Sequence, residues 1–277
     1  MSRRILLHIG SPKCGSTYLQ QVMLKNAKAL ALRGIRYPHD RPAAPDHPGN
    51  AADLDQIDRA GLDALFAGGA HTVVLSHEDL YSRAGLAKPL AALAREDGTT
   101  VQVLAFLRPF SEFLFGDYSQ FMKQHFETFL AKRKPYGGMD FPAFVQRRVR
   151  TLKPSAFLTN WQKQFPDTAI RVSSHRAMRN VLEHELGAGA ALDWEVPHHS
   201  TNPSLRMEDC DRITVAMHDP AVTDRAIRSM FRAAFRKTRA PDSGRTPERI
   251  ARIEGAFAAE NTALLEKFGY DNRLPES

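Results

Sequence analysis

Short apolar runs alternate with stretches of helical spacing along this chain, and that alternation limits its fold more than any other feature. The apolar runs are too short for helices and predict strands that are covered on both faces. Strands that alternate with helices favour a parallel sheet wrapped by helices. We expect strands at residues 3–9, 72–76, 100–107 and 169–173, and helices at residues 17–33, 53–66, 87–95, 110–129 and 155–165.

The remainder of the chain, to Gly269, is predicted to be mostly helical, interrupted by a polar loop at residues 197–203. Residues 38–49, rich in Pro, Asp and His, predict a loop, and Gly34 is expected to end the first helix. The aromatic run from Phe106 to Phe129 is interpreted mostly as core. The 277 residues, 43% of them hydrophobic, can bury a sizeable core, and we expect one α/β domain over residues 1–277.

Parallel sheets of this kind bind ligands just beyond the carboxyl ends of their strands. The segments that follow Ile9, Ser76 and Leu107 are therefore the first places to look for a site.

The segment after Ile9 is a loop with glycines at Gly10 and Gly15 that opens a helix. Backbone N–H groups of such a loop can surround a phosphate at the helix N-terminus, and glycine allows the tight turn. Ser16 and Thr17 add hydroxyl groups. The two glycines have the separation of a Walker A loop, but the lysine is Lys13 rather than the residue after the second glycine, which argues against an ordinary Mg-ATP kinase.

The stretch Pro12-Lys13-Cys14-Gly15-Ser16-Thr17-Tyr18-Leu19 resembles the 5′-phosphosulfate loop of sulfotransferases that use 3′-phosphoadenosine-5′-phosphosulfate (PAPS), written P-K-x-G-[ST]-[ST]-x-L. The resemblance implies a three-layer P-loop-like fold, with a mostly parallel central sheet flanked by helices and a helical C-terminal portion. It also implies that Lys13 contacts the oxygen between sulfate and 5′-phosphate. The loop residues implied to bind PAPS are Ser11, Pro12, Lys13, Cys14, Gly15, Ser16 and Thr17.

The segment after Leu107 is similar to the 3′-phosphate segment of the same family, with Arg108 and Tyr118 in register. Gly116 stands where the family usually has serine, so the 3′-phosphate is expected to be held by Arg108 together with backbone donors, or by a hydroxyl such as Ser111 or Ser119. A guanidinium at a strand end pairs well with phosphate. The alternative is that Arg108 pairs with a structural carboxylate.

The segment after Ser76 supplies candidates for a general base, His77 and Glu78. Glycan-type sulfotransferases use a glutamate and cytosolic ones a histidine, usually from elsewhere in the chain, so the resemblance makes Glu78 the first choice and His77 the second. An attacking hydroxyl must lose its proton, and a positioned base contributes roughly 10²–10⁴-fold. The alternative is that Glu78 caps the next helix and His77 is a surface residue.

The chain is basic, with a formal net charge of +7 and a pI of about 9.5. This charge suits an anionic ligand, whether nucleotide, nucleic acid or membrane surface, and a solvated basic surface explains it equally well. No nucleic-acid motif is visible, so nucleic acid ranks last among the partners. The chain shows no export segment and no apolar stretch near the roughly 20 residues that span a bilayer, so we expect a cytoplasmic protein with reduced Cys14 and Cys210.

We therefore expect in-line transfer of a sulfuryl group from PAPS to a hydroxyl or amine of a small-molecule, lipid or glycan acceptor, with no metal required. The loop with His198 and His199, and the helix at residues 257–265, also look like those of bacterial members; the two histidines lack convincing metal-ligand spacing. The family's R-K-G-x-x-G loop is absent. The alternatives are a P-loop small-molecule kinase that uses ATP and Mg²⁺, and a non-catalytic nucleotide- or polyanion-binding protein.

Overall fold

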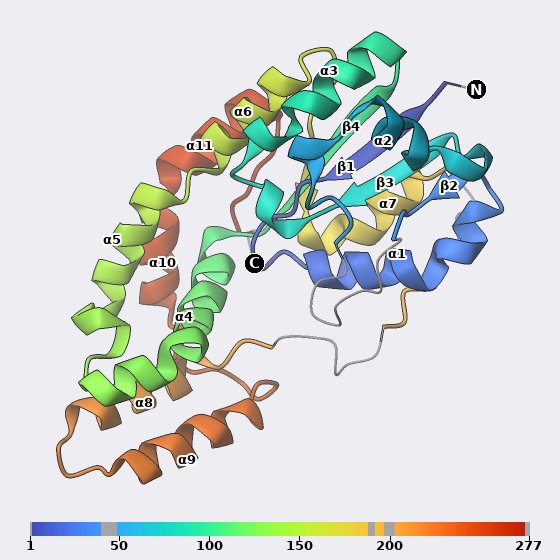
Figure 1. Cartoon of the computed structure of the whole chain (residues 1–277). Coiled ribbons are helices and arrows are strands. Elements are labelled where there is room, and N and C mark those ends of the chain that lie inside the picture. The colour runs from blue at the N-terminus through green and yellow to red at the C-terminus, as the bar shows by residue number, and fades with distance from the viewer. Residues whose placement is uncertain (1, 40–48, 188–191, 197–202, 275–277) are drawn as a thin grey trace. The chain divides into compact units, whose positions relative to one another are not determined.

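A computed structural model describes residues 2–39, 49–187, 192–196 and 203–274 (Figure 1). The chain forms two compact units. The first comprises Met1–Arg108, Pro154–Thr201 and Ala263–Tyr270, and the second comprises Pro109–Lys153, Asn202–Thr262 and Asp271–Ser277. The single domain expected from the sequence stays a prediction.

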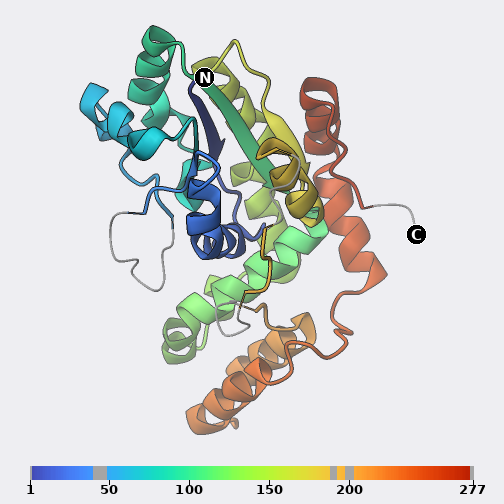
Figure 2. The same ribbon diagram turned by 90° about the vertical axis from the view of Figure 1, so that its right-hand side faces the viewer.

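The first unit contains a parallel sheet whose five described strands lie in the order β2-β3-β1-β4-β5. Their bounds are β1 Arg4–His8, β2 Ile35–Arg36, β3 Thr72–Ser76, β4 Thr100–Leu107 and β5 Arg171–Ser174. β1 and β4 run side by side, as the blue and green strands of Figure 2 show. His8 is in register with Ser76, so β1 and β3 end at the same level of the sheet and their loops meet there.

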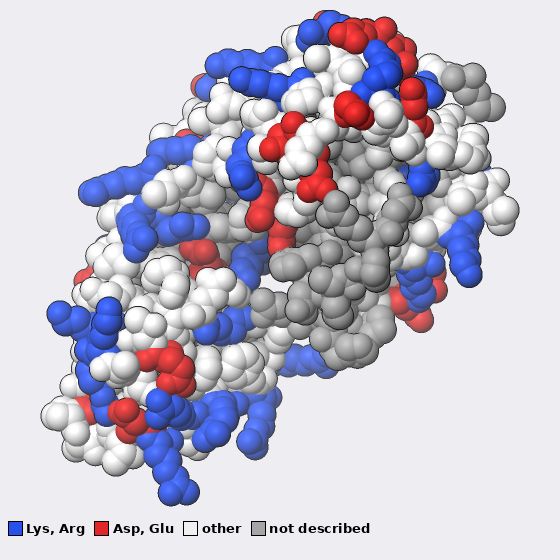
Figure 3. Space-filling view, viewed as in Figure 1, with Lys and Arg blue, Asp and Glu red and all other residues white. Residues whose placement is uncertain are grey.

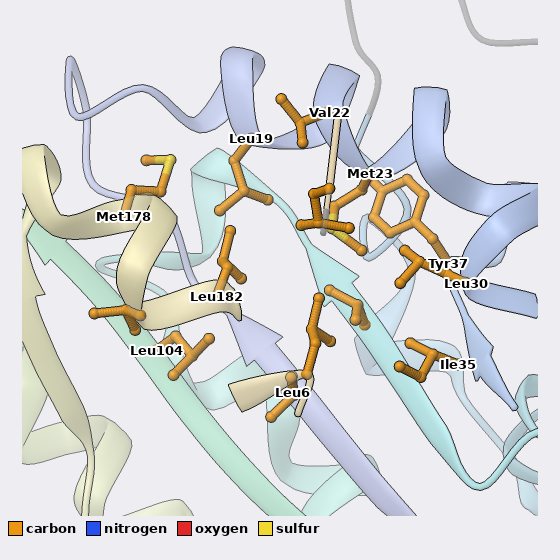
Figure 4. Packing of buried hydrophobic residues seen from close by; sticks show 14 of the residues in the cluster. Leu6, Leu19, Val22, Met23, Leu30, Ile35, Tyr37, Leu104, Met178 and Leu182 are labelled. Carbon is orange, nitrogen blue, oxygen red and sulfur yellow. The ribbon is translucent and has the colours of Figure 1, made fainter. Parts of the chain in front are cut away.

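Helices cover both faces of this sheet, which makes the unit a three-layer α/β, P-loop-like fold, as expected (Figure 1). α1 (Ser16–Ala31) and α7 (Met178–Glu185) pack on one face. Leu19 and Leu182 meet Leu6 of β1 there, in a buried cluster that Figure 4 shows from close by. Neighbouring strand residues point to the opposite face, where the helices include α3 (Lys88–Asp97) and α6 (Pro154–Gln164). α2 spans Arg59–Leu65, and short 3₁₀ turns are η1 Leu54–Gln56, η2 Ala67–Gly69, η3 Glu78–Leu80, η4 Ala84–Ala87, η5 Pro135–Gly138 and η6 His175–Ala177.

The described part of the second unit is helical, and the C-terminal portion of the chain is helical as expected. Its helices are α4 Phe110–Lys132, α5 Phe141–Thr151, α8 Met207–His218, α9 Asp224–Phe235 and α10 Pro247–Ala256; α11, Ala258–Phe268, begins in this unit and ends in the first. The core is aromatic. The rings of Tyr118 and Tyr136 stack with centroids 3.7 Å apart, and Phe141 and Phe144 meet Tyr118 edge-on. The aromatic run on α4 is therefore mostly core, as predicted.

The sequence predicted one continuous helix over residues 53–66, and this prediction is wrong, because the segment forms two separate elements. η1 ends at Gln56, and Ile57 and Asp58 are extended before α2 begins. The carboxylate of Asp58 accepts a hydrogen bond of 2.7 Å from the N–H of Gly61, so this aspartate starts a new helix rather than continuing one. Gly34 is not the cap of α1, which ends at Ala31; it closes the following turn with a positive φ of 69°.

Two further elements were not predicted. β2 is only two residues long, too short for any periodicity to reveal it. Asp140 precedes α5, and its carboxylate accepts a hydrogen bond from the N–H of Ala143. α5 also has a proline in its first turn. Both features are recognisable signals of a helix start.

None of the helices in the described residues is long and apolar enough to cross a membrane. Cys14 and Cys210 are buried and form no disulfide.

Candidate functional site

The loop between β1 and α1 has a backbone built from left-handed residues. Gly10 and Gly15 have φ values of 66° and 90°, and Lys13, with a side chain, has φ 62°. A lysine in this region is uncommon and persists only where the surrounding structure imposes it. The N–H of Cys14 donates to the carbonyl of Ser11 and closes the turn. Residues of positive φ set between residues of negative φ can turn successive N–H groups toward a common point, as the backbone of an anion site does.

Gly10 is where the loops after β1 and β3 touch. A Cβ on Gly10 would lie 2.5 Å from the Cα of Glu78 and 3.0 Å from the carbonyl oxygens of His77 and Glu78. No side chain fits at that distance, so glycine is required for the two loops to approach. The structure thus brings the backbone of Glu78 against the start of the loop that carries Lys13.

The N-terminus of α1 is open. Gly15 is its N-cap residue and no side chain caps it. The hydroxyl of Ser16 is buried, its residue only 5% exposed, and it has no hydrogen-bond partner in the described part of the chain. A buried polar group without a partner costs about 1–3 kcal/mol, so native structures leave few of them. An orphaned hydroxyl at an uncapped helix N-terminus fits an anionic ligand that supplies the missing partner.

The other loop residues have mixed exposure. Ser11 and Cys14 are buried, and the Cys14 thiol donates a hydrogen bond of 3.6 Å to the Ser11 hydroxyl. Lys13 and Thr17 are half-buried and Pro12 is exposed.

Arg108 directly follows β4 and is half-buried. Within residues 2–39, 49–187, 192–196 and 203–274 it makes no ion pair, and its buried Nε has no hydrogen-bond partner. The structural carboxylate that could have explained this arginine is therefore absent from the described residues. A guanidinium at a strand end with an unsatisfied Nε suits an external oxyanion.

The end of β3 is held by Asn50. The N–H of Ser76 donates to the Asn50 side-chain oxygen over 2.7 Å, and the Asn50 N–H donates to the Ser76 carbonyl over 3.0 Å. His77 then caps η3: its Nδ1 accepts a hydrogen bond of 3.2 Å from the N–H of Asp79. Glu78 is exposed, and its carboxylate makes no hydrogen bond or ion pair with any described residue. The helix-cap interpretation therefore fits His77 and not Glu78.

A buried polar chain under the loop was missed from the sequence. His8 is 1% exposed, and its Nδ1 lies 2.8 Å from the Ser76 hydroxyl, which also accepts from the Gln20 amide over 3.1 Å. Burial lowers the pKa of His8 to about 4, so the ring is neutral. The available signal was a histidine inside an otherwise apolar strand.

Gly116, Ser111 and Ser119 belong to the second unit, on α4. Gly116 is buried, and the Ser119 hydroxyl is fully buried and accepts a hydrogen bond of 2.6 Å from the N–H of Leu205. The N–H of Ser111 donates to the Glu254 carboxylate over 2.9 Å. In this unit the hydroxyl oxygen of Ser119 and the N-terminus of α4 therefore both have partners within the chain.

His198 and His199, with most of the polar loop around them, lie outside the described residues. Among the residues that are described, no three His, Cys, Asp or Glu side chains gather as metal ligands would.

Neither a scan against models of protein families nor a search of curated proteins finds a match for this chain.

Proposed function

We propose that this chain is a PAPS-dependent sulfotransferase that transfers a sulfuryl group to a hydroxyl or amine of a small-molecule, lipid or glycan acceptor. The observation that carries the proposal is the orphaned Ser16 hydroxyl at the uncapped N-terminus of α1, behind a left-handed loop that contains Lys13. These features together suit a 5′-phosphosulfate, with the phosphate at the helix N-terminus. The cytoplasmic location stays a prediction.

Lys13 favours a sulfuryl donor over Mg-ATP. In a Walker A loop the lysine follows the second glycine and reaches the terminal phosphates. Here it precedes Gly15 and stands at the left-handed turn of the loop. In that position its ammonium suits the oxygen that bridges sulfur and the 5′-phosphate, where negative charge grows as the bond breaks.

The proposed transfer is in line. The acceptor oxygen forms a bond to sulfur while the bond from sulfur to the 5′-phosphate oxygen breaks, and the bridging electron pair leaves with 3′,5′-ADP. The acceptor proton passes to a carboxylate, and Lys13 with the loop N–H groups balances the charge on the leaving phosphate.

Glu78 is the proposed base because the geometry of its neighbour disfavours His77. The Nδ1 of His77 already accepts from Asp79, so the neutral ring carries its proton on Nε2 and has no other lone pair to receive one. Glu78 is exposed, has no partner among the described residues, and its backbone lies against Gly10.

Arg108 is the proposed ligand of the 3′-phosphate, since its unsatisfied Nε and missing carboxylate partner favour an external anion. Against this stand Gly116 in place of the family's serine and Ser119 in contact with Leu205. Those departures favour a second candidate, a non-catalytic protein that binds the nucleotide without turnover.

The test is isothermal titration with 3′,5′-ADP without metal, followed by turnover with labelled PAPS and a panel of acceptors. Arg108→Ala should lose binding by roughly tenfold to a hundredfold, whereas the matched control Arg95→Ala, an exposed arginine on α3, should bind as wild type. Glu78→Gln should keep binding and lose turnover by at least about a hundredfold.

Tight binding with no turnover on any acceptor would favour the non-catalytic protein. Binding of Mg-ATP in place of 3′,5′-ADP would overturn the proposal in favour of a kinase.

A further inference from the structure

Most of the net charge of this chain lies on one helix and the turn after it. The sixteen residues from Asp224 to Arg239 contain six cationic side chains and one carboxylate, a net charge of +5 against +7 for the whole chain. The six cations are Arg225, Arg228, Arg232, Arg236, Lys237 and Arg239. The single carboxylate, Asp224, is already paired with Arg133 over 2.6 Å.

Four of these arginines form a stripe along α9 and its C-cap residue, Arg236. Arg225, Arg228, Arg232 and Arg236 are spaced by three or four residues, which places them on one side of a helix over about 16 Å. All four are exposed. Arg228 pairs with Glu127 over 2.7 Å, and the other three make no ion pair with any described residue. Figure 3 shows Lys and Arg side chains gathered over the part of the surface that α8 and α9 form.

The opposite side of α9 fixes the helix to its unit. Ile227 and Ala234 are buried, and the ring of Phe231 stacks on Phe126 with centroids 3.8 Å apart. Because this apolar side is already used in packing, α9 cannot turn it into a bilayer, and the arginine stripe stays presented to solvent.

Phe235 is the exception to this division. It is 42% exposed, and Phe231 holds its ring edge-to-face at 5.2 Å. On the helix it lies beside the stripe, between the directions of Phe231 and Arg228. This position next to the arginines lets the ring meet the apolar layer of a surface whose charge the arginines contact.

We propose that α9 is a docking surface for an anionic lipid membrane, with the arginine stripe on the headgroups and Phe235 at the boundary with the acyl chains. Each arginine near such a surface contributes about 1 kcal/mol, and an aromatic ring at this depth adds apolar contact. The exposed ring of Phe235 beside the stripe favours a surface with an apolar layer, as a bilayer has, over duplex nucleic acid. The proposed membrane contact does not rest on the proposed sulfuryl transfer.

The experiment is co-sedimentation of the full chain with vesicles of phosphatidylcholine alone or with about one fifth phosphatidylserine. The protein should bind only the anionic vesicles. A triple variant, Arg225→Gln with Arg232→Gln and Arg236→Gln, should weaken binding by roughly a hundredfold. Phe235→Ser should weaken it severalfold.

The matched control removes three exposed cations elsewhere that have no partner among the described residues, with Lys28→Gln, Arg95→Gln and Lys163→Gln. It has the same net charge as the stripe variant and should bind as wild type. Equal losses in both triple variants would mean that overall charge alone drives binding, and no binding to anionic vesicles would also overturn the proposal. A Phe235→Ser variant that binds as wild type, with binding abolished by a soluble polyanion such as duplex DNA, would assign the stripe to that polyanion instead.

Discussion

Two helices of this chain follow strands of the sheet, and their N-termini differ. α1 follows β1, has no side-chain cap at Gly15, and begins with a buried Ser16 hydroxyl that lacks a partner among the described residues. α4 follows β4, and the N–H of Ser111 in its first turn donates to the carboxylate of Glu254, which is far away in sequence. One helix end therefore receives an anion from its own chain and the other does not.

The difference makes the N-terminus of α1, rather than that of α4, the candidate for an external anion. Both helix dipoles attract negative charge at their N-termini. At α4 the chain supplies that charge itself, and an added anion would have to compete with Glu254. At α1 no side chain caps the helix, and the buried Ser16 hydroxyl has no partner in the described part of the chain, at a cost in stability that a bound phosphate would remove.

The largest expected effect is on turnover. Lys13→Ala should reduce sulfuryl transfer on the order of a thousandfold, because the leaving phosphate loses its cation. Lys28→Ala, an exposed lysine near the other end of α1, is the matched control and should keep wild-type turnover. Steady-state kinetics with labelled PAPS measure both. Undiminished turnover in Lys13→Ala would contradict its assignment and remove the main functional distinction between the two helix ends.

The second effect is the change of the free energy of unfolding with pH, and it comes from His8 in the first unit. Burial lowers the pKa of His8 to about 4 from a usual 6.5, so the unfolded chain takes up this proton first as the pH falls. Stability is full above the unfolded pKa and is lost toward the folded pKa, by about 2 kcal/mol between roughly pH 7.5 and pH 5. In the second unit, by contrast, burial raises the pKa of Cys210 to about 12, outside this range.

Urea unfolding at the two pH values tests this. His8→Gln can still hydrogen-bond Ser76 but does not titrate, so its loss of stability on acidification should be smaller than that of wild type by that amount. His184→Gln, an exposed histidine on α7, should leave the wild-type dependence unchanged. Identical pH dependence in His8→Gln and wild type would mean that folding does not lower the pKa of His8.

The smallest effects have opposite signs at the two helix ends. Ser16→Ala should raise the free energy of unfolding of the ligand-free protein by about 1 kcal/mol, because it removes a buried hydroxyl without a partner, and should weaken 3′,5′-ADP binding severalfold. Glu254→Gln should lower the free energy of unfolding by about 1 kcal/mol, because α4 loses a charged partner, and should leave binding unchanged. Chemical unfolding and titration of both variants measure the pair. A destabilised Ser16→Ala would mean that the hydroxyl is satisfied, and a change of 3′,5′-ADP binding in Glu254→Gln would contradict the comparison of the two helix ends.

Much of the fold could be predicted from the sequence because its signals are local. The apolar runs at residues 72–76 and 100–107 coincide with β3 and β4 to the residue, and Gly10 and Gly15 have the positive φ that a tight loop requires. The failures have equally local causes: Asp58 was available as a cap that splits a predicted helix, and β2 is too short to show a period.

The candidate site could be predicted only in part. The motif selected the loop, and the order of the strands in the sheet brought the segment after Ser76 against Gly10. The residues around His8 could not predict its hydrogen bond with Ser76, because the two lie 68 residues apart and meet only when β1 pairs with β3.

The sequence by itself determined a parallel α/β sheet with a glycine-containing loop after its first strand, since strand length, helical spacing and glycine conformation are properties of neighbouring residues. Only the tertiary structure decided which polar groups keep a partner. Ser119 and the N-terminus of α4 are satisfied by Leu205 and Glu254, from distant parts of the chain, while Ser16 and the Nε of Arg108 are left without one among the described residues. Hydrogen bonds between distant residues depend on how the elements pack, and no single stretch of the sequence determines that packing.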